Sequence, residues 1–154
     1  MSALTDLEQL YRDTVLEHYR HPRNRTPLEA PHARALVHNP VCGDQVRVEL
    51  RLRDGAIEVA AAITRGCSIA VASGSLMTEW APGRRAEDVA ALRAGLESLV
   101  SGREGSAALP EAFRCFERVS ALPSRRRCAL LPWEALEVAL AEGPARAPGA
   151  QRIE

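Results

Sequence analysis

The sequence predicts a single α+β domain, in which a three-stranded antiparallel sheet is packed with about five helices. The main observation is the order of patterns, because strand patterns follow one N-terminal helix and helical patterns fill the rest. The length of 154 residues suits one domain with one core. Hydrophobic residues make up 46% and charged residues 26%, a mix typical of globular proteins. We expect the domain to cover 1–142 and a disordered tail to follow over 143–154.

The first predicted helix runs from Leu4 to Tyr19, where apolar residues recur at three- and four-residue spacing. The segment HPRN ends it, since a proline restricts the residue before it to extended conformations. A proline-containing loop follows and leads to a short strand from Ala33 to Val37.

A β-hairpin is predicted next. Gln45 to Arg53 alternates apolar and polar residues, and Asp54-Gly55 is a strong signal for the tight turn that follows. The polar alternate positions predict a half-solvated sheet, which needs helices on its apolar side. The inner face of the strand after the turn is expected to consist of Ile57, Val59, Ala61 and Ile63.

Four further helices are predicted after the hairpin because the apolar period changes from two to between three and four. They are Ser68 to Trp80, Glu87 to Leu99, Glu111 to Val119 and Pro132 to Ala141. Pro132 is expected near the first helical position, where its missing N–H costs little. The preceding segment LPSRRRC is interpreted as a loop, and both tryptophans as core residues.

Composition and charge exclude several classes of protein. The formal net charge is zero, and the one basic run, Arg125 to Arg127, has no aromatic residues between its arginines, so no nucleic-acid partner is expected. No stretch approaches the roughly 20 apolar residues of a membrane helix. The charged N-terminal segment lacks the apolar region of a secretory signal, which favours a cytoplasmic protein with reduced thiols.

The four cysteines occupy two kinds of position. Cys42 precedes the hairpin and Cys67 follows it, so the turn should place both, together with Asp44, at one rim of the sheet. Cys67 opens a helix, where free N–H groups favour a thiolate, and Cys128 lies just ahead of the last helix. Three thiolates and a carboxylate would suit a tetrahedral zinc site. The spacing alone also allows small buried residues, against which the neighbouring Gly43 and Gly66 argue, and Asp44 alone could be a turn residue.

Other candidates are given structural roles. Cys115 lies within a helix and has no glycine, aspartate or histidine nearby, so we expect it to be structural. None of the four histidines, His18, His21, His32 and His38, is expected to bind a metal. Ser73 and Ser75 lack a histidine or aspartate in a triad-like context, which argues against a hydrolase.

Four segments together resemble the U-type iron–sulfur cluster assembly proteins. LYRDTVLEHYRHPRN looks like the opening helix of that family. NPVCGD, GCSIAVASGSLMTE and RCALLPW look like its three cysteine motifs, in the same order. The match runs from about Leu10 to Leu140, and the joint occurrence of three motifs is highly specific.

The family has two branches, and three features favour the second. The IscU type is a scaffold on which a [2Fe–2S] cluster is built, whereas the SufU type holds zinc and accepts sulfur from a cysteine desulfurase. Arg127 stands where the scaffold branch typically has histidine, the segment from Ala81 to Leu122 is longer than in scaffolds, and CALLPW resembles the zinc branch.

The resemblance implies specific roles. Cys42, Asp44, Cys67 and Cys128 would bind Zn²⁺, Cys42 would accept the sulfur, and Arg125 would contact the partner or the acceptor side. A histidine of the desulfurase, of SufS or IscS type, would replace Cys42 on the zinc. The chain would then be a sulfurtransferase-type carrier that passes sulfur to downstream iron–sulfur assembly proteins. Two alternatives remain, a scaffold that binds iron as a [2Fe–2S] cluster through the same residues and an interaction protein with a structural zinc.

Overall fold

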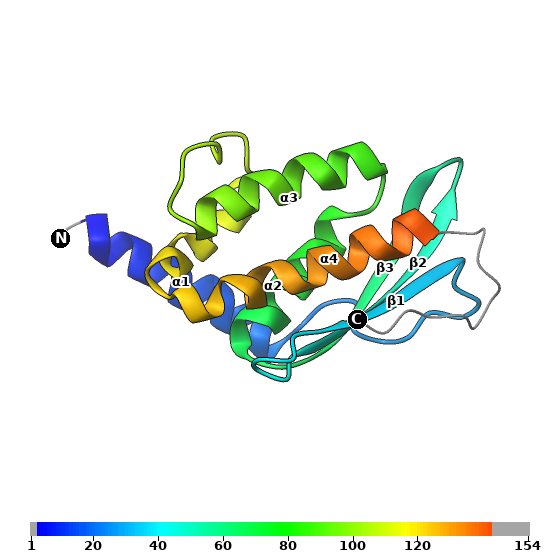
Figure 1. Cartoon of the computed structure of the whole chain (residues 1–154), viewed down its shortest axis with the longest axis horizontal. Helices are drawn as coiled ribbons and strands as arrows, with labels where there is room; N and C mark the ends of the chain where they lie inside the picture. The colour runs from blue at the N-terminus through cyan, green and yellow to red at the C-terminus, as the bar shows by residue number, and fades with distance from the viewer. Residues whose placement is uncertain (1–2, 143–154) are drawn as a thin grey trace.

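The computed structural model describes residues 3–142, and the tail expected over 143–154 lies outside them. Figure 1 shows a helix, a three-stranded sheet and then a series of helices, which confirms the predicted α+β class. Among the residues described, no helix has the length and apolar character needed to cross a bilayer. The elements are α1 (Ala3–Arg20), β1 (Ala33–His38), β2 (Gln45–Arg53), β3 (Ala56–Arg65), α2 (Ser68–Trp80), α3 (Ala86–Val100), the 3₁₀ helices η1 (Glu111–Ala121) and η2 (Pro123–Arg125), and α4 (Arg126–Glu142).

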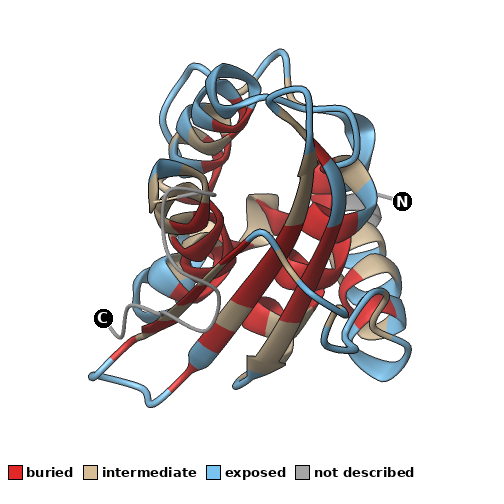
Figure 2. Ribbon diagram, turned by 90° about the vertical axis from the view of Figure 1, so that its right-hand side faces the viewer, coloured by how far each residue is buried: buried red, intermediate tan, exposed pale blue. Residues whose placement is uncertain are grey.

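The sheet is antiparallel with strand order β1-β2-β3, and helices cover its inner face. Val48 of β2 lies between Ala35 of β1 and Ala62 of β3, and all three side chains are buried. α2 and α4 pack on this face, while α3 covers the far side of α4 and α1 packs on α2 and η1. Figure 2 shows the buried residues where strands and helices face one another.

The predicted inner face of β3 is wrong over most of the strand. The register with β2 shifts between Arg51 and Leu52, so Ile57 and Ala60 point to the same side although they are three residues apart. Val59 is instead 36% exposed. A bulge changes which residues face the core, and strict alternation in a sequence does not reveal it.

The outer face of the sheet is less solvated than predicted, because the loop before β1 crosses it. Glu49 on this face is buried, and its carboxylate accepts the backbone N–H of Leu28 at 2.8 Å. The loop therefore covers a polar position that the sequence pattern assigns to solvent.

The last helix begins earlier than predicted, at Arg126, so that Pro132 lies inside it. The segment interpreted as a loop forms η2 and the first turn of α4, and it therefore places Cys128 within the helix. Proline cannot donate to the carbonyl four residues earlier, which weakens the helix at this point. Next to this point, the hydroxyl of Ser73 on α2 donates to the Ala129 carbonyl at 2.6 Å and accepts the Trp133 indole N–H at 3.1 Å, which ties α4 to α2.

A buried polar contact joins the end of α1 to α2. His18 Nδ1 lies 2.7 Å from Ser75 Oγ, which also accepts the backbone N–H of Arg23 at 2.9 Å. The sequence did not reveal this contact between His18 and Ser75, and both side chains are buried and serve the packing of the segment after α1. Burial, followed by the charge of Arg23, lowers the pKa of His18.

Replacing Ser73 with alanine should reduce the free energy of unfolding by about 1–3 kcal/mol, because it leaves the buried indole N–H of Trp133 without a partner. Urea denaturation measures this change. The exposed Ser124 on η2 offers a control, S124A, for which we expect no comparable loss. Equal stability of the Ser73 and Ser124 variants would contradict the assigned role.

The His18 contact predicts a loss of stability in acid. Because the folded state disfavours the protonated imidazole, the unfolded state binds the proton more readily, and stability is lost as the pH falls below about 6.5. Melting temperatures are measured at about pH 7.5 and about pH 5, on either side of the usual histidine pKa. The drop in melting temperature between them should be smaller for His18→Gln than for the unsubstituted protein. His21→Gln, at an exposed position, is the control for the loss of a histidine.

Candidate metal centre

The loop between β1 and β2, residues 39–44, is held in shape by Asn39. Its buried side chain accepts the N–H of Val41 at 3.0 Å, and its carbonyl accepts the N–H of Gly43 at 2.8 Å. Gly43 has a φ of +80°, a conformation that favours glycine. This turn exposes Cys42 and buries Asp44. The sequence reasoning missed Asn39, although the Asn-Pro dipeptide is a known turn signal.

Asp44 connects this loop to the start of α2. Its carboxylate accepts the Cys67 N–H at 3.3 Å, and its other oxygen lies 3.7 Å from Cys67 Sγ. Gly66 leaves room for this contact, since a Cβ at that position would lie 2.5 Å from Asp44 Oδ1. The pair thus depends on a glycine immediately before the cysteine.

Cys128, in the first turn of α4, completes the cluster. Its buried sulfur lies 3.9 Å from Cys42 Sγ, and ligand atoms of Cys42, Asp44 and Cys128 all fall within 4.8 Å of one another. Cys67 lies beside this trio through its contact with Asp44. The structure therefore brings together the four residues predicted from the motifs, at the sheet rim where the hairpin was expected to place them.

Two of the donor pairs have the separation expected in a tetrahedral zinc site. A zinc ion with Zn–S bonds of about 2.3 Å and Zn–O bonds of about 2.1 Å separates two sulfurs by about 3.8 Å, and a sulfur from an oxygen by about 3.6 Å. The distances are 3.9 Å between the Cys42 and Cys128 sulfurs, and 3.7 Å between Cys67 Sγ and an Asp44 oxygen. Cys67 lies outside the trio whose ligand atoms fall within 4.8 Å of one another, so its side chain would have to move inward to complete a four-donor site.

The electrostatics of the cluster favour a cation. Burial, the hydrogen bond to Asp44 and the nearby Cys67 together raise the pKa of Cys128, because a second and third negative charge are unfavourable here. A bound divalent cation reverses this effect and stabilises the thiolates. Arg125, at the end of η2, supplies a positive charge beside the thiols. Cys67, followed by Cys128, raises the pKa of Arg125 through charge and hydrogen bonding.

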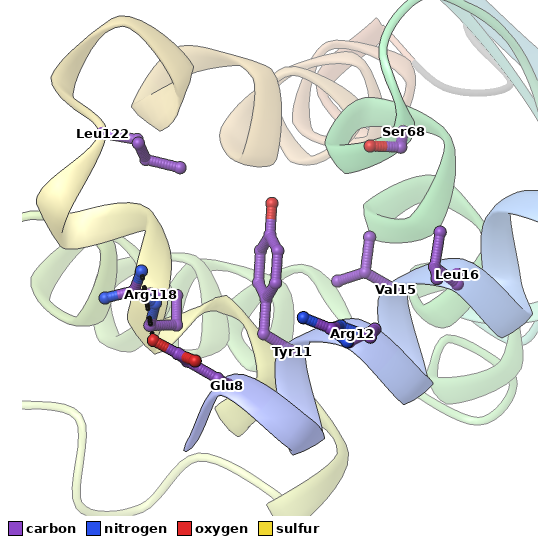
Figure 3. A pocket seen from close by; sticks show the side chains of 8 residues that line it. All are labelled: Glu8, Tyr11, Arg12, Val15, Leu16, Ser68, Arg118 and Leu122. Carbon is purple, nitrogen blue, oxygen red and sulfur yellow. Dashed lines mark ion pairs between the residues drawn. The ribbon is translucent and has the colours of Figure 1, made fainter. Parts of the chain in front are cut away.

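A pocket of about 400 Å³ opens beside Cys67, between α1, η1 and the first residue of α2. Figure 3 shows Tyr11 pointing its hydroxyl into this space, between Leu122 and Ser68. Burial, with the charge of Cys67, raises the pKa of Tyr11, so the phenol stays protonated next to the cluster. The pocket is lined by Glu8, Tyr11, Arg12, Val15, Leu16, Ser68, Arg118 and Leu122.

The histidines stand apart from the cluster. Within the described part of the chain, the one grouping of metal-binding side chains with this spacing is the trio on the sheet rim, which contains no histidine. His18 contacts Ser75, and His32 accepts the backbone N–H of Leu52 at 2.7 Å. Cys115 also lies elsewhere, 1% exposed in the core, where burial raises its pKa to about 12.

Fold and cluster together define a U-type iron–sulfur cluster assembly protein. The sequence model of the NifU-like N terminal domain matches residues 10–148, so the chain belongs to this family. The N-terminal part of a nitrogen-fixing NifU-like protein from Brucella abortus has the same fold, with a TM-score of 0.78, 26% identity, and coverage of 92% of this chain and 99% of that one.

Relatives of both branches match nearly the whole chain. The zinc-dependent sulfurtransferase SufU of Bacillus subtilis is 32% identical over 143 residues, which cover 92% of this chain and 97% of that protein. The iron–sulfur cluster assembly scaffold protein IscU of Streptococcus pyogenes serotype M1 is 34% identical over 140 residues, covering 90% and 87%. Sequence identity therefore confirms the family but does not separate its two branches.

The burial of the thiols predicts a clear order of reactivity. In metal-free folded protein, iodoacetamide should modify the exposed Cys42 and leave Cys115 intact, because Cys115 is buried and held as the neutral thiol. Peptide mass spectrometry measures both sites. Cys115 should react only after addition of urea, and its modification in the folded protein at the rate of Cys42 would contradict its position in the core.

Proposed function

We propose that this protein is a zinc-dependent sulfur acceptor in iron–sulfur cluster assembly. Cys42, Asp44, Cys67 and Cys128 hold the Zn²⁺, and Cys42 receives sulfur from the persulfide of a cysteine desulfurase. Downstream iron–sulfur assembly proteins receive the sulfur next. The relatives named as zinc-dependent sulfurtransferase and as assembly scaffold support the general process.

The observation that carries this proposal is the unequal exposure of the thiols. Cys42 is exposed on a loop tip, whereas Cys128 is fully buried and Cys67 is half-buried. Val41, next to Cys42, is 92% exposed, so nothing within the described residues covers this side of the thiol. A partner's persulfide can therefore reach Cys42 while the other donors remain in place.

The transfer step is balanced without an added oxidant or reductant. The Cys42 thiolate attacks the outer sulfur of the desulfurase persulfide, and a new S–S bond forms on Cys42. The S–S bond of the donor breaks, and the donor cysteine leaves as a thiolate. When bound, zinc supplies the deprotonated state of the thiols at neutral pH. Arg125 lies close enough to Cys67 and Cys128 to compensate their negative charge.

Arg127 supports the sulfur-acceptor assignment over the scaffold. Its guanidinium lies 3.4 Å from the carboxylate of Glu134, two turns later on α4. Arg127 therefore adds no ligand atom to the group of Cys42, Asp44 and Cys128. The resemblance places a histidine at this position in the scaffold branch. A scaffold for a [2Fe–2S] cluster remains the second candidate, because thiolates are also the usual ligands of such clusters and a scaffold relative is 34% identical.

Replacing Cys42 with alanine should abolish sulfur acceptance. Purified protein is incubated with a SufS-type cysteine desulfurase and cysteine, and persulfide on the acceptor is followed by intact-protein mass spectrometry. We expect one added sulfur on the unsubstituted protein, mapped to Cys42, and none on Cys42→Ala. The matched control is Cys115→Ser, which removes a thiol far from the cluster and should still accept sulfur.

The metal content of the purified protein distinguishes a zinc-dependent sulfur acceptor from an iron–sulfur scaffold. Protein purified without oxygen should contain about one zinc per chain and be colourless if the four donors form one tetrahedral site. Iron with matching labile sulfide would favour the scaffold. Sulfur acceptance by Cys42→Ala at the normal rate would sink the proposed role of Cys42, whichever metal is found.

A further inference from the structure

The outer edge of β3 is open next to the metal centre. The N–H of Ala62 points away from β2 and donates to the Asn24 carbonyl at 2.9 Å. Because backbone groups alternate along an antiparallel strand, Thr64, two residues later, directs its N–H and carbonyl to the same outer edge. Within the described part of the chain nothing pairs with them, so the edge ends in an unpaired N–H and carbonyl.

A pocket of about 480 Å³ lies along this open edge, between β3, the end of α1 and the side of α2. We call it the edge pocket, and it is separate from the pocket beside Tyr11. Its walls combine apolar surface with polar groups in similar amounts. It is lined by Tyr19, Pro22, Arg25, Ala62, Ile63, Thr64, Arg65, Gly66, Val71 and Ser75.

Two arginines give the lining of the edge pocket a positive charge. Arg25 and Arg65 are both exposed, and neither forms an ion pair or hydrogen bond with any described residue. No acidic residue lines the pocket. Tyr19 adds a ring that is 46% exposed, one of the few large hydrophobic side chains to be so. Such a surface is complementary to carboxylates attached to an apolar, extended chain.

We propose that the edge pocket binds an extended, acidic segment of a partner protein, which adds a short strand to β3. The free N–H and carbonyl of Thr64 would form the main-chain hydrogen bonds, as in other cases of strand addition. Arg25 and Arg65 would bind carboxylate side chains, a geometry that guanidinium groups favour. Asn24 already occupies the edge at Ala62, which limits the added strand to a few residues.

The edge pocket lies directly beside the candidate metal centre. Gly66 lines the edge pocket and directly precedes Cys67, so a bound segment would be held beside the metal-binding cluster. The exposed Cys42 would remain available, since it lies on the loop between β1 and β2. The binding itself does not depend on the proposed sulfur transfer, and it can be measured without a desulfurase.

Fluorescence anisotropy with a labelled peptide tests the proposal. The probes are fluorescein-labelled VEVDVE and its neutral counterpart VQVNVQ, titrated with the metal-loaded, full-length protein. We expect the acidic peptide to bind at least about tenfold more tightly, and the double variant R25Q/R65Q to lose about tenfold in affinity. Arg34, on the opposite edge strand β1, also lacks a partner within the described residues, and R34Q should bind as the unsubstituted protein does.

A backbone readout separates strand addition from simple charge attraction. In ¹⁵N-labelled protein, VEVDVE should shift the amide resonance of Thr64 more than those of β1. Zinc content and circular dichroism of R25Q/R65Q confirm that the variant is folded. Equal binding of both peptides, unchanged affinity in R25Q/R65Q, no binding at millimolar peptide, or shifts confined to β1 would each overturn the proposal. A failure of Cys42 to accept sulfur would leave this result unaffected.

Discussion

The contact between Asp44 and Cys67 is the interaction on which the geometry of the centre depends. It joins the loop before β2 to Cys67, the N-cap residue of α2, and it does so across the open end of the hairpin, where Gln45 pairs with Arg65. The buried carboxylate satisfies a free N–H at the start of a helix, which is a favourable position for an anion. Any side chain larger than hydrogen before Cys67 would displace it.

The position of Cys128, the fourth candidate donor, is set by contacts between α4 and α2. Cys128 lies in the first turn of α4, and the Ser73 hydroxyl holds that turn to α2 through the Ala129 carbonyl. Trp133 then packs against Phe113 and Trp80, with ring centroids 5.7 and 5.4 Å away. The candidate metal centre thus lies where α2 and α4 begin. The aromatic contacts of Trp133 hold the two helices in their relative positions. Arg125, on the turn that leads into α4, reaches the thiols because of the same placement.

Local patterns in the sequence were sufficient for the hairpin, for most of the helices and for the rim that collects Cys42 and Cys67. The errors arose where long-range packing overrides a local rule. A bulge near Arg51 changes which side of β3 is buried, and α4, which is packed on α2 and bonded to it at Ala129, continues through Pro132. The fourth donor, Cys128, could be grouped with the others from its position ahead of the last helix, but no local spacing relates it to the hairpin, and the resemblance to the family made the grouping specific. Asn24 covers the edge of β3 at Ala62 and leaves Thr64 open. The hydrophobic periodicity of the sequence does not predict where this contact falls.

The hydrogen bonding of the 39–44 loop has a consequence for the kinetics of ligand exchange. The bonds that shape the loop, those of Asn39 to Val41 and Gly43, begin and end within it. Rotation of Cys42 away from the cluster therefore breaks no backbone hydrogen bond to the sheet or to a helix. Such a motion belongs to the nanosecond-to-microsecond range of loops and does not require local unfolding. With a metal bound as proposed, three donors would be anchored and Cys42 would be free to move, so the lifetime of the Cys42–metal bond, and not the stability of the fold, would set how quickly Cys42 is released.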